Sequence, residues 1–186
     1  MVALSAAGSP TEVLAFWFAP GREAQWFGGG EAFDDEVRAA LGPLCERALS
    51  GALPDWETTP DGLRALVLLL DQAPRNLFRK SPRSFAGDAE ARRLARLALA
   101  RGDDLGLSSD ERSFLYLPLE HSEDLADQVL SEALFATLGN EDFAFSARRH
   151  REIVERFGRF PHRNETLGRA TTAEEAAFLR EPNSSF

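Results

Sequence analysis

The most hydrophobic predicted helix of this chain lies within residues 59–76, which read TPDGLRALVLLLDQAPRN. Thr59 and Pro60 are typical of a helix start, because threonine caps the first turn and proline is tolerated at the first helical position. The leucines and valine that follow cover all sides of the helix, which predicts a central place in the fold. Pro74 is expected to end or bend it.

Similar start and stop signals flank this stretch on both sides, with expected N-terminal caps at Ser9, Ser108 and Thr172. We expect helices from Pro10 to about Pro20, from Phe33 to Leu49 with a kink at Pro43, from Asp88 to Arg101, from Ser109 until Pro118 interrupts it, from His121 to Leu138, from Phe143 to Phe157, and a short one after Thr172. No alternating pattern typical of strands competes with these helices. The predicted fold class is therefore all-α, with packed antiparallel helix pairs in one domain over residues 1–186 and an ordered core at about 10–180.

The composition of the chain argues against several classes of function. The net charge of −9 argues against a nucleic-acid partner, because phosphate contacts need clustered cations. The longest apolar run, Ala65 to Leu70, is too short to span a membrane, and no positive charge precedes Arg22 to form a secretory leader. The single cysteine, Cys45, is interpreted as a small core residue. These features predict a soluble cytoplasmic protein with no membrane partner.

Polar residues at places where burial is expected form three motifs. The first is Asp71 to Asn76, directly after the central helix. An unpaired carboxylate is costly to bury, so we expect Asp71 to pair with an arginine. The alternative is a capping and salt-bridge cluster with a purely structural role.

The second motif is Leu119 to Gln128. On one continuous helix His121, Asp124 and Gln128 would share a face, so that the carboxylate could orient the imidazole for proton transfer or metal binding. The pattern is equally typical of an acidic helix start that stabilises a protonated histidine. A metal site is disfavoured, because no His-x-x-x-His or Glu-x-x-His pair occurs.

The third motif is Arg156 to Asn164, a Gly/Pro-rich turn with arginines, aromatics and His162. Arginine suits bidentate recognition of carboxylate or phosphate, and a rigid turn lowers the ordering cost of binding. His150, just before this turn, shares a helix face with apolar residues. We interpret it as a core histidine bonded to backbone.

These motifs resemble domain-of-unknown-function family 924 over about residues 10–180. The resemblance rests on Phe16 to Phe18 with Trp26 and Phe27, Leu69 to Asn76, Phe85 to Asp88, Tyr116 to Asp124, and Gly158 to Asn164. Ala73 departs from it, where a bulkier apolar residue is expected. The resemblance implies a tetratricopeptide-like α-α superhelix, and it implies no settled reaction, no cofactor and no particular partner.

Two functions fit these observations. The first is a pocket for a small anionic molecule bearing phosphate or carboxylate, formed where the three motifs converge, and acting by binding alone or as an enzyme. The candidate proton-transfer residues are His121 and His162, held by Asp71, Glu120 and Asp124; the candidate anion contacts are Arg75, Arg79, Arg159 and Arg163; and Gln72, Asn76 and Asn164 would orient the ligand. The alternative is a protein- or peptide-binding helical scaffold in which the polar motifs are structural.

Overall fold

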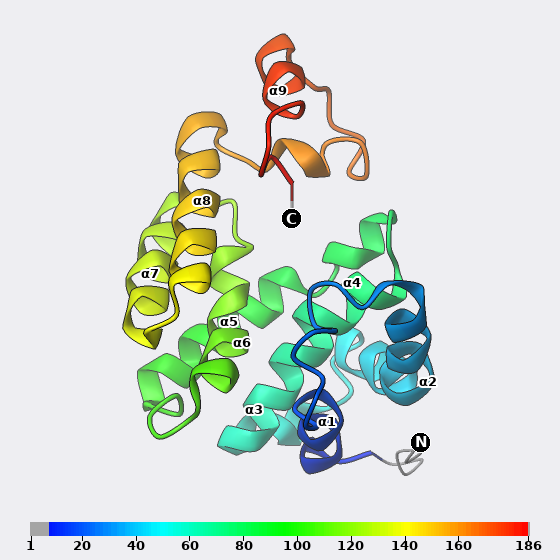
Figure 1. Cartoon of the computed structure of the whole chain (residues 1–186). Coiled ribbons are helices and arrows are strands. Elements are labelled where there is room, and N and C mark those ends of the chain that lie inside the picture. The colour runs from blue at the N-terminus through cyan, green and yellow to red at the C-terminus, as the bar shows by residue number, and fades with distance from the viewer. Residues whose placement is uncertain (1–7, 186) are drawn as a thin grey trace.

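Helices supply all the regular structure of the computed structural model, which describes residues 8–185 of the predicted domain and leaves 1–7 and 186 outside (Figure 1). The all-α prediction is therefore confirmed for this part of the chain. The elements are α1 (Pro10–Trp17), α2 (Gly30–Leu49), η1 (Pro54–Thr58), α3 (Pro60–Val67), η2 (Leu68–Gln72), α4 (Ala73–Leu77), η3 (Pro82–Phe85), α5 (Asp88–Arg101), α6 (Ser109–Glu120), α7 (Leu125–Phe135), η4 (Ala136–Leu138), α8 (Glu141–Phe157), η5 (Pro161–Arg163) and α9 (Ala173–Phe178). The tetratricopeptide-like superhelix stays a prediction.

Local side-chain caps start most of the long helices where the sequence predicts them. Ser9 and Thr59 each accept a hydrogen bond from a backbone N–H in the first turn, with proline following at the first helical position. Ser108 and Thr172 form reciprocal capping boxes with the glutamates three residues on. No described helix is long and apolar enough to cross a membrane.

The core surrounds α3, as its all-round hydrophobicity predicts. α1, α5 and α6 all pack against α3, and its residues Leu63 and Ala65 are fully buried. Trp17 of α1 meets Phe114 of α6 edge-on, with ring centroids 5.5 Å apart. This geometry is favourable for aromatic pairs, and it ties the N-terminal helix to the middle of the chain.

The central helix changes pitch just before Pro74. Residues Leu68–Gln72 form one turn of π-helix, closed by a hydrogen bond from the Ala73 N–H to the Leu68 carbonyl, and helix α4 then continues to Leu77. Pro74 has no N–H to offer the Leu70 carbonyl, so a wider turn at this point disturbs the ladder least. π-Turns often accompany functional sites, and this one carries Asp71 and Gln72.

The predicted helix from His121 to Leu138 is wrong. α6 runs through Pro118 to Glu120, and His121 is its C-cap. α7 starts anew at Leu125, with Asp124 as its N-cap. Pro118 lies in the last turn, where the lost N–H weakens only one hydrogen bond, so it does not interrupt the helix as predicted. His121 and Asp124 therefore do not share a helix face.

Gly87 lets α5 approach the π-turn closely. A Cβ atom there would lie 2.2 Å from the Leu70 carbonyl oxygen, a backbone atom that cannot turn aside. We predict that Gly87→Ala lowers the free energy of unfolding by about 1–3 kcal/mol, as overpacked sites do. The matched control is Gly42→Ala inside α2, where the nearest atom is 3.8 Å away.

The control should raise stability by about 0.5–1 kcal/mol through helix propensity. Urea unfolding monitored by circular dichroism measures both variants. Equal effects of the two substitutions would show that the approach of α5 to the π-turn is not tight.

The C-terminal segment packs through a small apolar cluster of its own. The cluster consists of Ile153, Val154, Phe160 and Phe178, with Phe157 at its edge. α8 ends at Phe157, and the C-cap Gly158, with a φ of 67°, turns the chain sharply. Figure 1 shows the segment that follows, in orange, leading away from α8, with α9 beyond it. Contacts described below place η5 of this segment beside η3 and α5.

Candidate functional site

A buried carboxylate holds an imidazole at the centre of the candidate site. Asp71 is fully buried, and both its oxygens lie close to Nδ1 of His121, at 2.8 and 3.0 Å. Gln72 donates to Oδ2 of the same carboxylate at 2.6 Å. Burial alone would raise the pKa of Asp71, but Arg75 and the hydrogen bonds from His121 and Gln72 hold it well below its usual range. Asp71 is thus a permanent anion at neutral pH.

Arg75 joins Asp71 to a second carboxylate on α5. Its Nη1 lies 3.3 Å from Oδ1 of Asp71 and 3.0 Å from Oδ1 of Asp88, and its Nη2 lies 3.2 Å from Oδ2 of Asp88. Nη1 also donates to the Asp71 carbonyl. Burial would lower the pKa of Arg75, but the two carboxylates raise it. The expected pairing of Asp71 with an arginine is confirmed.

Arg163 is a buried cation with few hydrogen bonds. It is only 7% exposed, and its guanidinium lies over the rings of Phe160 and Phe85, 4.5 and 4.9 Å from their centroids. Nη1 is 3.7 Å from Oδ2 of Asp88, beyond hydrogen-bond distance, and the buried Nε has no acceptor among residues 8–185. Burial first, and then Arg75, lower the pKa of Arg163 to about 10. Buried charged donors normally find acceptors, so the Nε of Arg163 is an exception to that rule within residues 8–185.

His121 is placed to take up a proton. Burial and Arg75 lower its pKa, so the imidazole is neutral at pH 7. Because the Asp71 carboxylate can only accept, Nδ1 of His121 carries the hydrogen and Nε2 keeps its lone pair. An imidazole fixed in this tautomer by a carboxylate is the usual form of a general base.

A second imidazole–carboxylate pair lies beside the first. Nδ1 of His150 is 2.8 Å from Oε1 of Glu120 and 2.9 Å from the Ser146 carbonyl, and Ser146 Oγ donates to the same Oε1 at 2.8 Å. His150 and Glu120 are 4% and 2% exposed. The ring centroids of His150 and His121 are 6.3 Å apart. The predicted backbone bond of His150 is present, but so is a buried carboxylate.

The comparisons with known proteins agree with the resemblance in the sequence. The family model described as bacterial protein of unknown function (DUF924) matches residues 13–183. The chain belongs to this family. A solved structure of a protein of unknown function from Agrobacterium tumefaciens is similar, with a TM-score of 0.87 and 40% identity over 92% of this chain and 96% of that one. No curated protein matches this DUF924 chain.

Part of the predicted site comes together in the DUF924 chain. The first polar motif lies on the π-turn and α4. The site residues of the second motif lie at the end of α6, and those of the third lie on η5. The residues that meet are Asp71, Gln72, Arg75, Glu120, His121 and Arg163. His162 lies near them, with its ring centroid 5.6 Å from that of Phe160, and burial followed by Arg163 lowers its pKa to about 3.

The other predicted residues have different partners. Asn76 and Arg79 both bind Asp34 of α2, at 2.7 and 2.8 Å, and Arg159 binds Glu175 at 2.6 Å. Asn164 is 3.4 Å from Thr171 Oγ1, and Asp124 accepts from the N–H of Ala126 as the cap of α7. No hydrogen bond or ion pair among the described residues joins these five side chains to the Asp71–His121 pair. Within 8–185, no group of His, Cys, Asp or Glu is placed to hold a metal ion.

The sequence interpretation missed Asp88, Ser146 and the role of His150. In the sequence Asp88 starts a predicted helix and belongs to a motif of the resemblance, but no pattern there indicates a site residue. Glu120 was assigned to the site, but its partner, His150, lies on α8, thirty residues further along the chain. No local pattern could connect them.

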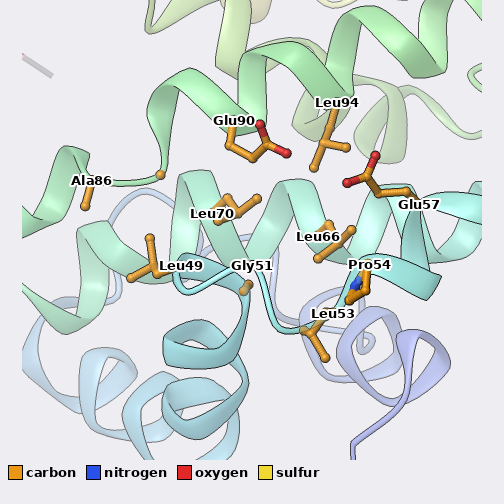
Figure 2. Close-up of a pocket in the computed structure, with 12 residues that line it drawn as sticks. Leu49, Gly51, Leu53, Pro54, Glu57, Leu66, Leu70, Ala86, Glu90 and Leu94 are labelled. Atoms are coloured by element: carbon orange, nitrogen blue, oxygen red, sulfur yellow. The ribbon is translucent and has the colours of Figure 1, made fainter.

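The pocket shown in Figure 2 lies apart from these charges. It encloses about 190 Å³ and is lined mainly by apolar residues, with Leu66 and Leu70 on one side and Leu94 on the other. Glu57 and Glu90 extend into its rim, but both pair with Arg93, at 2.8 and 2.6 Å. Their charges are therefore already balanced. None of the charged residues of the candidate site lines this pocket.

Proposed function

We propose that this protein binds a small oxyanion, a carboxylate or phosphate group, at Arg163 and Arg75, beside the imidazole of His121. The observation that carries the proposal is the buried Arg163 guanidinium, whose Nε has no acceptor in residues 8–185. A planar guanidinium with open donors matches the paired oxygens of both groups. Three side chains at the site keep some exposure, which gives a ligand access: Arg75 at 21%, Asp88 at 24% and His121 at 15%.

The same geometry supports an enzyme. His121, fixed by Asp71, would remove a proton from a substrate or a water molecule next to the bound anion. Fixed charge around the oxyanion would lower the activation barrier of the reaction, because the dipoles and cations of the site are already oriented before the substrate reacts. The scaffold alternative has less support, since Asp71, Glu120, His150 and Arg163 are buried, and so do not form an exposed recognition surface.

Arg163→Met tests the proposal. Methionine keeps the apolar stem against Phe85 and Phe160 but removes the cation, so we expect sulfate, phosphate and acetate to bind at least about tenfold more weakly. Isothermal titration calorimetry and ligand-induced shifts in Tm measure the affinities. Asp88 keeps Arg75 as its partner in the variant.

A stability measurement separates function from structure. We expect Arg163→Met to unfold at the same or a higher urea concentration, because the substitution removes a poorly bonded buried charge. Arg156→Met is the matched control, since Arg156 is an exposed arginine of the same segment paired with Glu174. A large loss of stability in Arg163→Met, with no wild-type affinity for any of the three anions, would overturn the proposal.

A further inference from the structure

The charges at the site already sum to a negative value before any anion binds. Two guanidinium groups, Arg75 and Arg163, face three carboxylates, Asp71, Asp88 and Glu120. The other nearby acid, Glu123, is neutralised by Arg169 at 2.7 Å and lies outside this count. An incoming oxyanion would add at least one more negative charge in a poorly solvated place. Such an excess is costly unless a cation or a proton accompanies the anion.

The two imidazole–carboxylate pairs offer a place for that proton. At His121 the Nδ1–H is directed at the buried Asp71 carboxylate, and at His150 Nδ1 bonds the Ser146 carbonyl and lies 2.8 Å from Oε1 of Glu120. Protonation at Nε2 of either ring therefore gives an imidazolium whose first donor is already satisfied. At His121 the second donor of the imidazolium can then donate to an oxyanion. The two rings lie 6.3 Å apart, close enough for a proton on either to act on the same small ligand.

We propose that the site takes up its oxyanion together with one proton, held on the His121–His150 pair. This inference rests on the proposed function and limits the ligand to small oxyanions that carry one or two negative charges, such as a carboxylate, a sulfate or a phosphate monoester. It excludes polyphosphates. It also makes His150 a second acid–base group. Hydrolysis and elimination reactions require a base and an acid that act on the same bound molecule.

The groups around both imidazole rings affect how readily His121 or His150 takes up this proton. His121 faces Asp71 on η2, Arg75 on α4, Asp88 on α5, His150 on α8, and His162 and Arg163 on η5; His150 faces Glu120 on α6, Ser146 on its own helix, and Phe160 and His162 after α8. Burial first, and then arginine charge, disfavour an imidazolium at His121 in the free protein, and a bound anion offsets the arginine charge. Anion binding therefore raises the proton affinity of His121, and the anion binds more tightly as pH falls.

Sulfate is the probe, because its own charge is fixed between about pH 5 and 8 and any proton taken up belongs to the protein. Isothermal titration calorimetry is carried out at one pH in buffers of different ionisation enthalpy. The dependence of the binding enthalpy on the buffer gives the number of protons taken up per bound sulfate. We expect uptake approaching about one proton per sulfate, and an affinity that falls up to about tenfold for each unit rise in pH. Binding with no proton uptake and no pH dependence would overturn the inference but leave the proposed function standing. No binding of sulfate, phosphate or acetate at any pH would remove both.

Nuclear magnetic resonance locates the proton. The chain has three histidines, so three Cε1–Hε1 signals are expected, assignable with His→Gln variants. When sulfate is added, the signal of His121 or of His150 should move toward its protonated position. A shift confined to His162 would contradict the assignment. Asp88→Asn removes one carboxylate next to both arginines, and should bind sulfate more tightly at pH 7.5 with less proton uptake, whereas the exposed Asp61→Asn should behave as wild type.

Discussion

Asp71→Asn is expected to lower the free energy of unfolding by about 3–5 kcal/mol, the range for breaking a buried ion pair. The side chain is fully buried and is contacted by Arg75, His121 and Gln72. Asparagine keeps the shape but loses the charge, so the cation of Arg75 retains only Asp88. Because small domains are stable by only about 5–15 kcal/mol, this is a large fraction of the total.

Urea unfolding at pH 7 measures the effect. Asp61→Asn is the matched control, since its carboxylate is 58% exposed and paired with Arg64 on the surface. The control should change stability by no more than about 1 kcal/mol. A loss below that level in Asp71→Asn as well would show that the Asp71 cluster is solvated rather than sheltered, and would weaken the case for a ligand site there.

Acid should remove the contribution of Asp71 to the free energy of unfolding over a defined range of pH. Its pKa is lowered in the folded state, so the unfolded chain binds a proton first as pH falls. The stabilisation is fully present above the unfolded pKa of about 3.9 and is lost as pH drops through the folded value. Asp71→Asn should therefore differ from the wild type most at neutral pH and least in strong acid.

Local chemistry explains what the sequence could predict. The caps at Ser9, Thr59, Ser108 and Thr172 depend on residues within one turn, and all four are confirmed. The central place of α3 follows from its composition in the same way. The break between α6 and α7 after Glu120 is not predicted from the sequence. The apolar residues keep a helical spacing across the break, so they indicate one continuous helix. Asp124 accepts from the N–H two residues on, and an N-cap aspartate was the signal available there.

The site could be predicted only in part, because its contacts join distant segments. Asp71 and His121 lie fifty residues apart in the chain, and Arg163 reaches Asp88 from the far end. The sequence supplied the residue types and the expectation that buried charges must be paired. It could not tell that Arg79 and Arg159 would find Asp34 and Glu175, since surface and buried arginines look alike in sequence. Only tertiary packing separates the two groups.

His162 is the second residue with a large expected effect, and its effect is on acid stability. Burial first, and then the Arg163 charge, lower its pKa to about 3 in the folded protein, against 6.5 for an ordinary histidine. Between these values the unfolded chain binds the proton and the folded chain does not. Stability is therefore lost as pH falls below about 6.5, by up to about 1.4 kcal/mol for each unit.

This window lies above the one in which Asp71 acts, so the two effects are separable. His162→Gln cannot take up a proton, and its stability should fall by about 2–3 kcal/mol less than that of the wild type between pH 6.5 and about pH 4.5. Each protein is compared with itself across pH by urea unfolding, which cancels any packing change caused by the substitution. Asp88, whose pKa is raised by burial, contributes in the opposite sense in both proteins and also cancels. Parallel acid curves would mean that His162 is protonated in the fold, and the positive charge assigned to the His121–His150 pair would then belong to His162 instead.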